Sequence, residues 1–208
     1  MNDYTLLEPT QTLPKRSFAD PERNADDLAA MDVMADCLRQ LLRQPGLLPT
    51  EPRPLILNLG EEDGRWHRAV ISQVEELLKA QDLTAVGFFG HKVKDMNHAV
   101  LDDLDRALVT EFVQHPGVLS YSSLELSNGD HGNLVLLNPP EAKEHWRTST
   151  RHVYAAQELS PQHYECVRLH NGCLPGGLMS GNAPVLQRTK YYDYRGGETW
   201  RAVRELMA

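Results

Sequence analysis

The sequence predicts an α+β fold, and three observations lead to that prediction. First, 208 residues allow one large domain or two small ones. Second, 41% hydrophobic and 24% charged residues are ordinary globular usage, which excludes a disordered or fibrous chain. Third, the expected elements between Leu83 and His170 follow the order β, α, β, β, α, β. That order is the ferredoxin-like βαββαβ motif, which forms an antiparallel sheet.

The first 80 or so residues of the chain predict an arm, a helix and a βα unit. Residues 1–23 contain three prolines and no apolar period, so we expect an extended arm. Apolar residues then recur at steps of three and four up to Pro45, which predicts an amphipathic helix from Asn24. Residues 54–59 predict a short strand, and an apolar stripe from Trp66 to Leu78 predicts a second helix after Asp63. Residues 24–208 are expected to form a single domain.

The ferredoxin-like unit is expected at about residues 83–170. A strand is predicted at 83–93 and a helix at 97–114, each from the spacing of its apolar residues. Residues 118–126 and 133–138 predict a hairpin, because the segment between them is rich in turn-forming residues.

The remaining elements follow the same reasoning. A helix is predicted at 141–157 and a strand at 164–170, followed by a glycine-rich segment at 171–182 that is either a plain turn or a loop lining a ligand. A strand at 187–194, rich in tyrosine, and a short helix at 199–207 complete the chain.

Charge and composition exclude several classes of function. A formal net charge of −8 argues against nucleic acid as a partner, because phosphate binding needs a basic surface. Residues 141–208 carry more basic than acidic side chains, so an anionic small ligand is expected there first. No apolar run is long enough to cross a membrane and the N-terminus lacks the pattern of a secretory signal, so we expect a cytoplasmic protein without a membrane partner. The three cysteines show no CxxC spacing, which argues against a disulfide framework.

The helix at 141–157 contains the densest group of candidate functional side chains. His145 and His152 are seven residues apart and share one face of the helix, but ~10.5 Å along its axis keeps them from binding one metal ion together. A single histidine can instead be the axial ligand of a haem, with nearby arginines meeting the propionates. We expect His152 to be that iron ligand and Trp146 to shape the pocket. The arginines available for the carboxylates are Arg147, Arg151 and Arg168. The alternative is that these histidines make ordinary surface hydrogen bonds.

Two further histidines are candidates for a catalytic base. His91 alternates with Phe89 along the strand at 83–93, so both side chains share one face of the sheet. If that face lines a barrel interior, His91 is a buried general base; if it faces helices, His91 is a core histidine with its hydrogen bonds satisfied. His170 ends the strand at 164–170, where polar groups often line a cleft.

The segment HWRTSTRHVYAAQELSPQHYECVRLH, in its ferredoxin-like setting, resembles the dimeric α/β-barrel superfamily. That superfamily includes antibiotic-biosynthesis monooxygenases, haem-degrading monooxygenases and chlorite-dismutase-like proteins. The resemblance covers about Leu83 to His170 and implies a homodimer in which two sheets pair into a barrel. In the haem-degrading branch an asparagine, a tryptophan and a helical histidine act together. Here Trp146 and His152 match the last two, whereas the first strand offers Gly90 and His91 and no asparagine.

The sequence thus supports three hypotheses for function. The first is a protein that binds haem or another aromatic small molecule between sheet and helix and performs oxidative chemistry. The second is a cofactor-independent monooxygenase in which His91 or His170 is the base. The third is a non-catalytic module for dimerisation or protein contact. A polar cavity beside His152 or His91 favours a ligand-binding protein, and an interior filled with aliphatic side chains favours the module.

Overall fold

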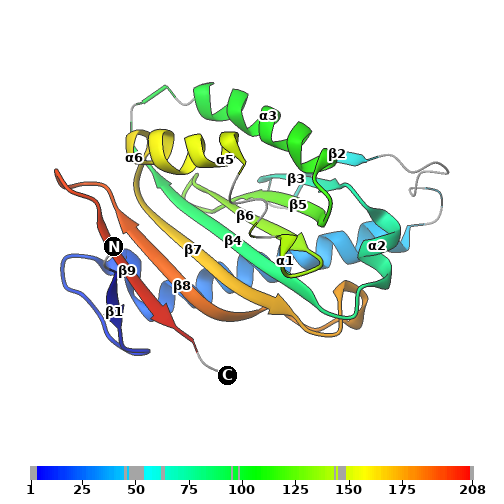
Figure 1. The fold of residues 1–208 in the computed structure, drawn as a ribbon, viewed down its shortest axis with the longest axis horizontal. Helices are drawn as coiled ribbons and strands as arrows, with labels where there is room; N and C mark the ends of the chain where they lie inside the picture. Colours follow the sequence, from blue (N-terminus) through cyan, green and yellow to red (C-terminus); the bar gives the residue numbers. More distant parts are fainter. Residues whose placement is uncertain are drawn as a thin grey trace.

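A computed structural model describes residues 4–44, 46, 54–61, 64–94, 96–97, 99–142, 144 and 149–206. Within these residues, nine strands form one mixed sheet in the order β1-β9-β8-β7-β4-β6-β5-β3-β2 (Figure 1). Neighbouring strands are antiparallel except β1 and β9, which are parallel. The α+β class predicted from the sequence is therefore confirmed.

The centre of the sheet is formed by the residues expected to make the ferredoxin-like unit. Strand β4 (Leu83–Lys92), helix α3 (Ala99–Gln114) and the hairpin of β5 (Val118–Glu125) and β6 (His131–Leu137) match their predicted elements closely. Strand β7 (Tyr164–Leu174) pairs with the other side of β4. The whole sheet is larger than a simple βαββαβ sheet, because two strands extend it beyond β5 and three extend it beyond β7.

Helix α1 (Pro21–Arg43) covers one face of the sheet, which we call the α1 face. Its apolar stripe, including Met31, Met34 and Leu38, packs against side chains of the strands such as Phe89 and Leu134. All five side chains are at most 1% exposed. Figure 1 shows α1 behind the strands, on the opposite side from α3. A helix of the same chain therefore fills the face through which two sheets would pair in a barrel.

The other face is covered by α3 and by a helical segment that runs from α5 (Thr150–Tyr154) through a π-turn at Ala155–Leu159 to α6 (Ser160–His163). The predicted helix at 141–157 therefore continues to His163, and part of it lies outside the described residues. A second core, which includes Val109 of α3, fills the space between this layer and the sheet.

Two predicted helices are wrong. Residues 66–78 form strand β3 (Trp66–Ile71) and only a short helix α2 (Val74–Lys79), with β3 between β5 and β2 (Leu55–Gly60). The apolar residues of this segment follow a helical period, but residues 66–71 pair with strands on both sides, and this tertiary pairing overrides the local pattern.

Residues 200–205 form strand β9 and not the predicted helix. Strand β9 pairs with β8 (Val185–Asp193), so tertiary pairing overrides the local helical propensity of the segment. The glycine-rich loop also starts later than predicted, because β7 continues to Leu174. A Cβ at Gly172 would lie 2.0 Å from the carbonyl oxygen of Val185, so this glycine permits close approach of β8 and not of a ligand.

The N-terminal arm is held against the sheet by a buried arginine. Strand β1 (Thr5–Leu7) pairs with β9, and Arg204 of β9 is fully buried. The Arg204 guanidinium donates hydrogen bonds to four backbone carbonyls of the arm, those of Glu8, Pro9, Gln11 and Ala19. These bonds fix the course of residues 8–19. In the described part of the chain, no helix combines the length and apolar character needed to cross a membrane.

Candidate functional site

His91 and Asp130 form a hydrogen-bonded pair at the end of β4. His91 is the last regularly paired residue there, because the pairing with β7 shifts between His91 and Lys92. Nδ1 of His91 lies 2.6 Å from Oδ2 of Asp130, which belongs to the turn before β6. The side chain of Asp130 is 11% exposed and that of His91 is 39% exposed. A mostly buried carboxylate thus supports an imidazole that solvent can reach.

The surrounding turn fixes the Asp130 carboxylate. Its Oδ1 accepts a hydrogen bond from the backbone N–H of Lys92 at 3.0 Å, and its Oδ2 accepts one from the side-chain amide of Asn128 at 2.7 Å. An ionised carboxylate can only accept, so Nδ1 of His91 carries the proton of the shared hydrogen bond. In the neutral imidazole, Nε2 is then the free proton acceptor. The carboxylate Oε2 of Glu165 lies 4.0 Å from that nitrogen.

The sequence left open whether His91 is a buried base or a core histidine, and its place in the structure fits neither description. His91 is on the α1 face together with Phe89, but Phe89 is buried against α1 whereas His91 is partly exposed. His91 is therefore neither a buried base inside a barrel nor a fully satisfied core histidine. A histidine oriented by a carboxylate can act as a general base or acid near neutral pH.

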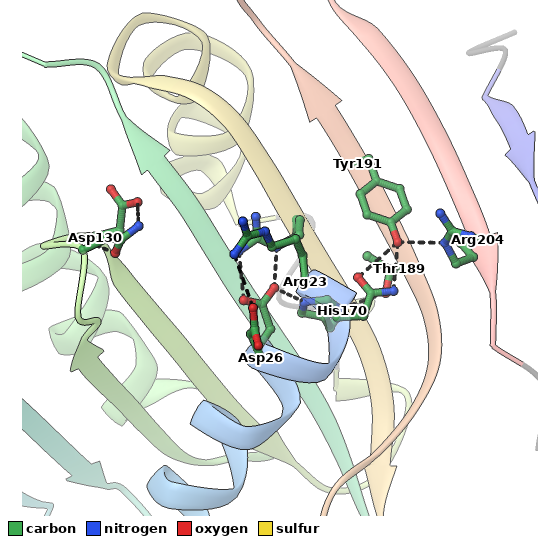
Figure 2. Close-up of polar contacts among 11 residues, drawn as sticks. Arg23, Asp26, Asp130, His170, Thr189, Tyr191 and Arg204 are labelled. Atoms are coloured by element: carbon green, nitrogen blue, oxygen red, sulfur yellow. Dashed lines mark hydrogen bonds and ion pairs between the residues drawn. The ribbon is translucent and has the colours of Figure 1, made fainter. Parts of the chain in front are cut away.

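A second polar cluster lies buried beneath α1, and Figure 2 shows part of it. Asp27 of α1 accepts hydrogen bonds from Nε and Nη2 of Arg168 and is 2.8 Å from Nε2 of His170. Nδ1 of His170 is 2.8 Å from the hydroxyl of Thr189. Burial raises the pKa of Asp27, but the hydrogen bonds and charges of Arg168 and His170 outweigh it and hold that pKa below its usual value. The cluster ties α1 to β7 and β8.

The cluster leaves His170 no accessible nitrogen. Its side chain is fully buried, and both ring nitrogens have partners. His170 and Arg168, predicted for different roles, are thus brought together by one carboxylate. Proton transfer between His170 and a ligand would require α1 to move away.

A cavity of about 270 Å³ lies between the N-terminal arm and the turn that joins β8 to β9. It is lined by Lys15, Arg16, Asp193, Arg195, Gly196, Glu198 and Trp200. Asp193 accepts two side-chain hydrogen bonds from Arg195, each 2.9 Å long, and forms an ion pair of 3.2 Å with Nε of Arg16. The hydrogen bond from Arg195 is the main cause that lowers the pKa of Asp193 below its ordinary value.

Of the described residues predicted to hold haem, His152 and Arg151 lie on one helix and Arg168 lies elsewhere. His152 and Arg151 lie on α5, where Arg151 forms an ion pair of 3.6 Å with Glu111 of α3. Arg168 is on the α1 face, across the sheet from α5, and Asp27 engages its guanidinium. Trp146 and Arg147 lie outside the described residues. One haem cannot use His152 as its iron ligand and Arg168 for a propionate in this arrangement, so of the three arginines predicted as alternatives, Arg168 does not suit a haem bound at His152.

Sequence reasoning missed the carboxylates that organise these clusters. Asp130 sits in a segment that we interpreted only as a turn, and Asp27 sits in a helix that we interpreted only by its apolar stripe. No local signal assigns either residue to its histidine, because the partners are 39 and 143 residues apart. The Asn128-Gly129 pair, a common turn dipeptide, is the one local hint that the side chains there are fixed.

Comparison with known proteins does not identify a family. No family description and no curated protein matches the chain. A solved structure, an aldoxime dehydratase, aligns with 77% of this chain and 42% of its own, at 11% identity and a TM-score of 0.30. The chain thus spans less than half of that protein, and the likeness is too distant to assign a function.

Proposed function

We propose that this protein binds a small organic molecule and removes a proton from it at His91. The observation that carries the proposal is the pairing of an exposed imidazole with a mostly buried carboxylate, at 2.6 Å between Nδ1 and Oδ2. In this arrangement the carboxylate fixes the tautomer of the histidine and stabilises the imidazolium that forms.

The proton transfer uses groups that are already in position. A C–H or O–H of the ligand loses its proton to Nε2 of His91, and its electron pair stays on the ligand as an anion. The positive charge on the imidazole is then balanced by Asp130, which Lys92 and Asn128 hold in place. Oε2 of Glu165 lies 4.0 Å from Nε2 and places a second carboxylate beside the ring.

A cofactor-independent monooxygenase is a finer version of the same proposal. In such a reaction the base removes a proton from an activated CH₂ group, and O₂ oxidises the resulting anion. One oxygen atom enters the ligand as C=O and the other leaves as water. Of the two histidines predicted for this role, His91 is the one accessible to a ligand, because His170 is fully buried.

A non-catalytic module is the second candidate, and a different observation favours it. The space between α1 and the sheet is filled by aliphatic and aromatic side chains, as expected for a protein whose sheet serves contact rather than catalysis. The superfamily resemblance implies a homodimer, but α1 fills the face on which two sheets would pair, so a dimer of this chain would use another surface. Light scattering coupled to size exclusion measures the oligomeric state directly.

Hydrolysis of p-nitrophenyl acetate tests the proposed base, because imidazole groups catalyse this reaction. We expect His91→Gln and Asp130→Asn each to lower the rate above background by at least about tenfold, since an oriented general base contributes on the order of 10²-fold or more. His115→Gln is the matched control, because it removes a histidine distant from the site. Equal rates in all four proteins would overturn the proposal.

A titration with haemin, followed by the Soret band, tests the haem hypothesis in parallel. A saturable band that disappears in His152→Ala would support haem binding at α5 in place of the reaction at His91. A band that does not depend on His152 would remove that hypothesis.

A further inference from the structure

The cavity between the N-terminal arm and the β8–β9 turn contains an arginine that is fixed on two sides. Nε of Arg16 forms the ion pair with Oδ2 of Asp193, and its guanidinium carbon lies 4.4 Å from the centre of the Trp200 ring. Stacking on an indole and an ion pair along one edge together define the plane of a guanidinium. The side chain is nevertheless 33% exposed.

The two terminal nitrogens of Arg16 are available to a ligand. Within the part of the chain that the structure describes, Nε of Arg16 is buried beside Asp193 without a hydrogen bond, so Asp193 holds it as an ion pair, and Nη1 and Nη2 make no ion pair of their own. A guanidinium offers paired N–H groups that match the two oxygens of a carboxylate. Because the Nε edge is used by Asp193, the Nη1–Nη2 edge is the one that can receive such a pair.

The charges around the cavity favour an anion. Arg195 and Arg16 both contact the single carboxylate of Asp193, which leaves one positive charge in excess there. Lys15 and Glu198 complete the lining and offset each other. This local excess contrasts with the net charge of −8 of the whole chain, so the cavity attracts anions that the rest of the surface repels.

The site is organised before any ligand arrives. Arg16 belongs to the arm, and the arm follows a fixed course because Arg204 holds its carbonyl groups on both sides of Arg16, at Gln11 and Ala19. Preorganised donors lose little conformational entropy on binding, which is a main cost of recognising a small ligand.

We propose that this cavity is a binding site for a small planar carboxylate, held by Arg16 through its Nη1–Nη2 edge. The volume of about 270 Å³ is at the lower limit of ligand pockets, so the ligand has the size of one ring with its carboxylate. The site is separate from the proposed base. Asp193 of β8 is in register with Cys166 of β7, and Cys166 is in register with His91 of β4. The backbones of Asp193 and His91 therefore lie two strand spacings of about 4.8 Å apart.

Calorimetric titration of the full chain with benzoate tests the site, with inorganic phosphate and acetate as further probes. We expect saturable binding of benzoate that Arg16→Gln weakens at least about tenfold, because a charged hydrogen-bonded pair is lost. Arg16→Lys keeps the charge but not the paired donors, so it should restore only part of the affinity. Arg23→Gln is the matched control, since Arg23 is an exposed arginine near the start of α1 that pairs with Asp26.

The outcomes separate this inference from the proposed function. If His91→Gln leaves the affinity for benzoate unchanged and Arg16→Gln lowers it, the Arg16 cavity is a binding site independent of His91. No saturable binding, or equal affinity in the wild type and Arg16→Gln, overturns the inference even if His91 proves to be a base. Circular dichroism and the thermal midpoint of Arg16→Gln establish that the variant is folded. If Arg23→Gln weakens benzoate binding as much as Arg16→Gln does, the binding reflects non-specific attraction to positive charge, and the inference is overturned.

Discussion

The substitution Asp27→Asn removes the one negative charge that pairs with Arg168 and His170 beneath α1. The Asp27 side chain is 4% exposed and that of Arg168 is 14% exposed, so water cannot replace the lost partner. An asparagine keeps one acceptor oxygen but turns an NH₂ group toward the other donors. Breaking a buried ion pair by removing one partner costs about 3 to 5 kcal/mol of unfolding free energy, and we expect a loss of that size.

Urea denaturation at a series of pH values measures the unfolding free energy lost in Asp27→Asn and shows whether the charge of Asp27 is its cause. The folded-state pKa of Asp27 is lowered, so its stabilising contribution is complete above the unfolded value of 3.8 and is lost as the pH falls through the folded value. The unfolding free energy of the wild type should therefore fall toward acid pH more steeply than that of Asp27→Asn. The two curves should converge below the folded pKa of Asp27.

The next residue provides a matched control. Asp26 lies on the same helix, but its side chain is 68% exposed and pairs with Arg23 at 3.3 Å. We expect Asp26→Asn to change the unfolding free energy by less than about 1 kcal/mol, as is usual for exposed ion pairs. Equal losses in Asp26→Asn and Asp27→Asn would refute the claim that the buried cluster ties α1 to the sheet.

Three further predictions concern the arm, the core and the thiols. Replacement of Arg204 by Met leaves the arm carbonyls without their donor, so trypsin should cleave after Lys15 or Arg16 faster than in the wild type, and an unchanged cleavage rate would contradict the role of Arg204. Leu38→Ala should cost about 2 to 5 kcal/mol in urea denaturation, because Leu38 is 0% exposed, whereas Val33→Ala on the exposed face of α1 should cost under about 1 kcal/mol. Burial raises the pKa of Cys37 and of Cys166 to about 11, so Ellman's reagent should modify both thiols more slowly in the folded protein than in urea; equal rates would contradict their burial.

Elements with one dominant period were predictable from the sequence. Helix α1 has a 3.6-residue apolar stripe over 23 residues, and β4 alternates over 10 residues, so both were located within a few positions. Residues 66–71 and 200–205 form strands because neighbouring strands satisfy their backbone groups. That information lies in distant residues, and a local pattern cannot contain it.

The candidate site was only partly predictable for the same reason. The sequence singled out His91, but its activity in our proposal depends on Asp130, and the pairing of β4 with β6 brings the two together. The sequence predicts His170 as a base because the strand predicted at 164–170 ends there. The strand continues to Leu174, which places His170 in the interior of the sheet and under α1.

In the proposed function, Asp130 orients His91 so that Nε2 accepts a proton. Nitrogen-15 NMR of labelled protein reads the tautomer directly, because the protonated and unprotonated ring nitrogens have well separated shifts. At alkaline pH the account predicts that His91 is the Nδ1–H tautomer in the wild type and shifts toward the Nε2–H form in Asp130→Asn. An Nε2–H tautomer in the wild type, or no change in Asp130→Asn, would contradict it.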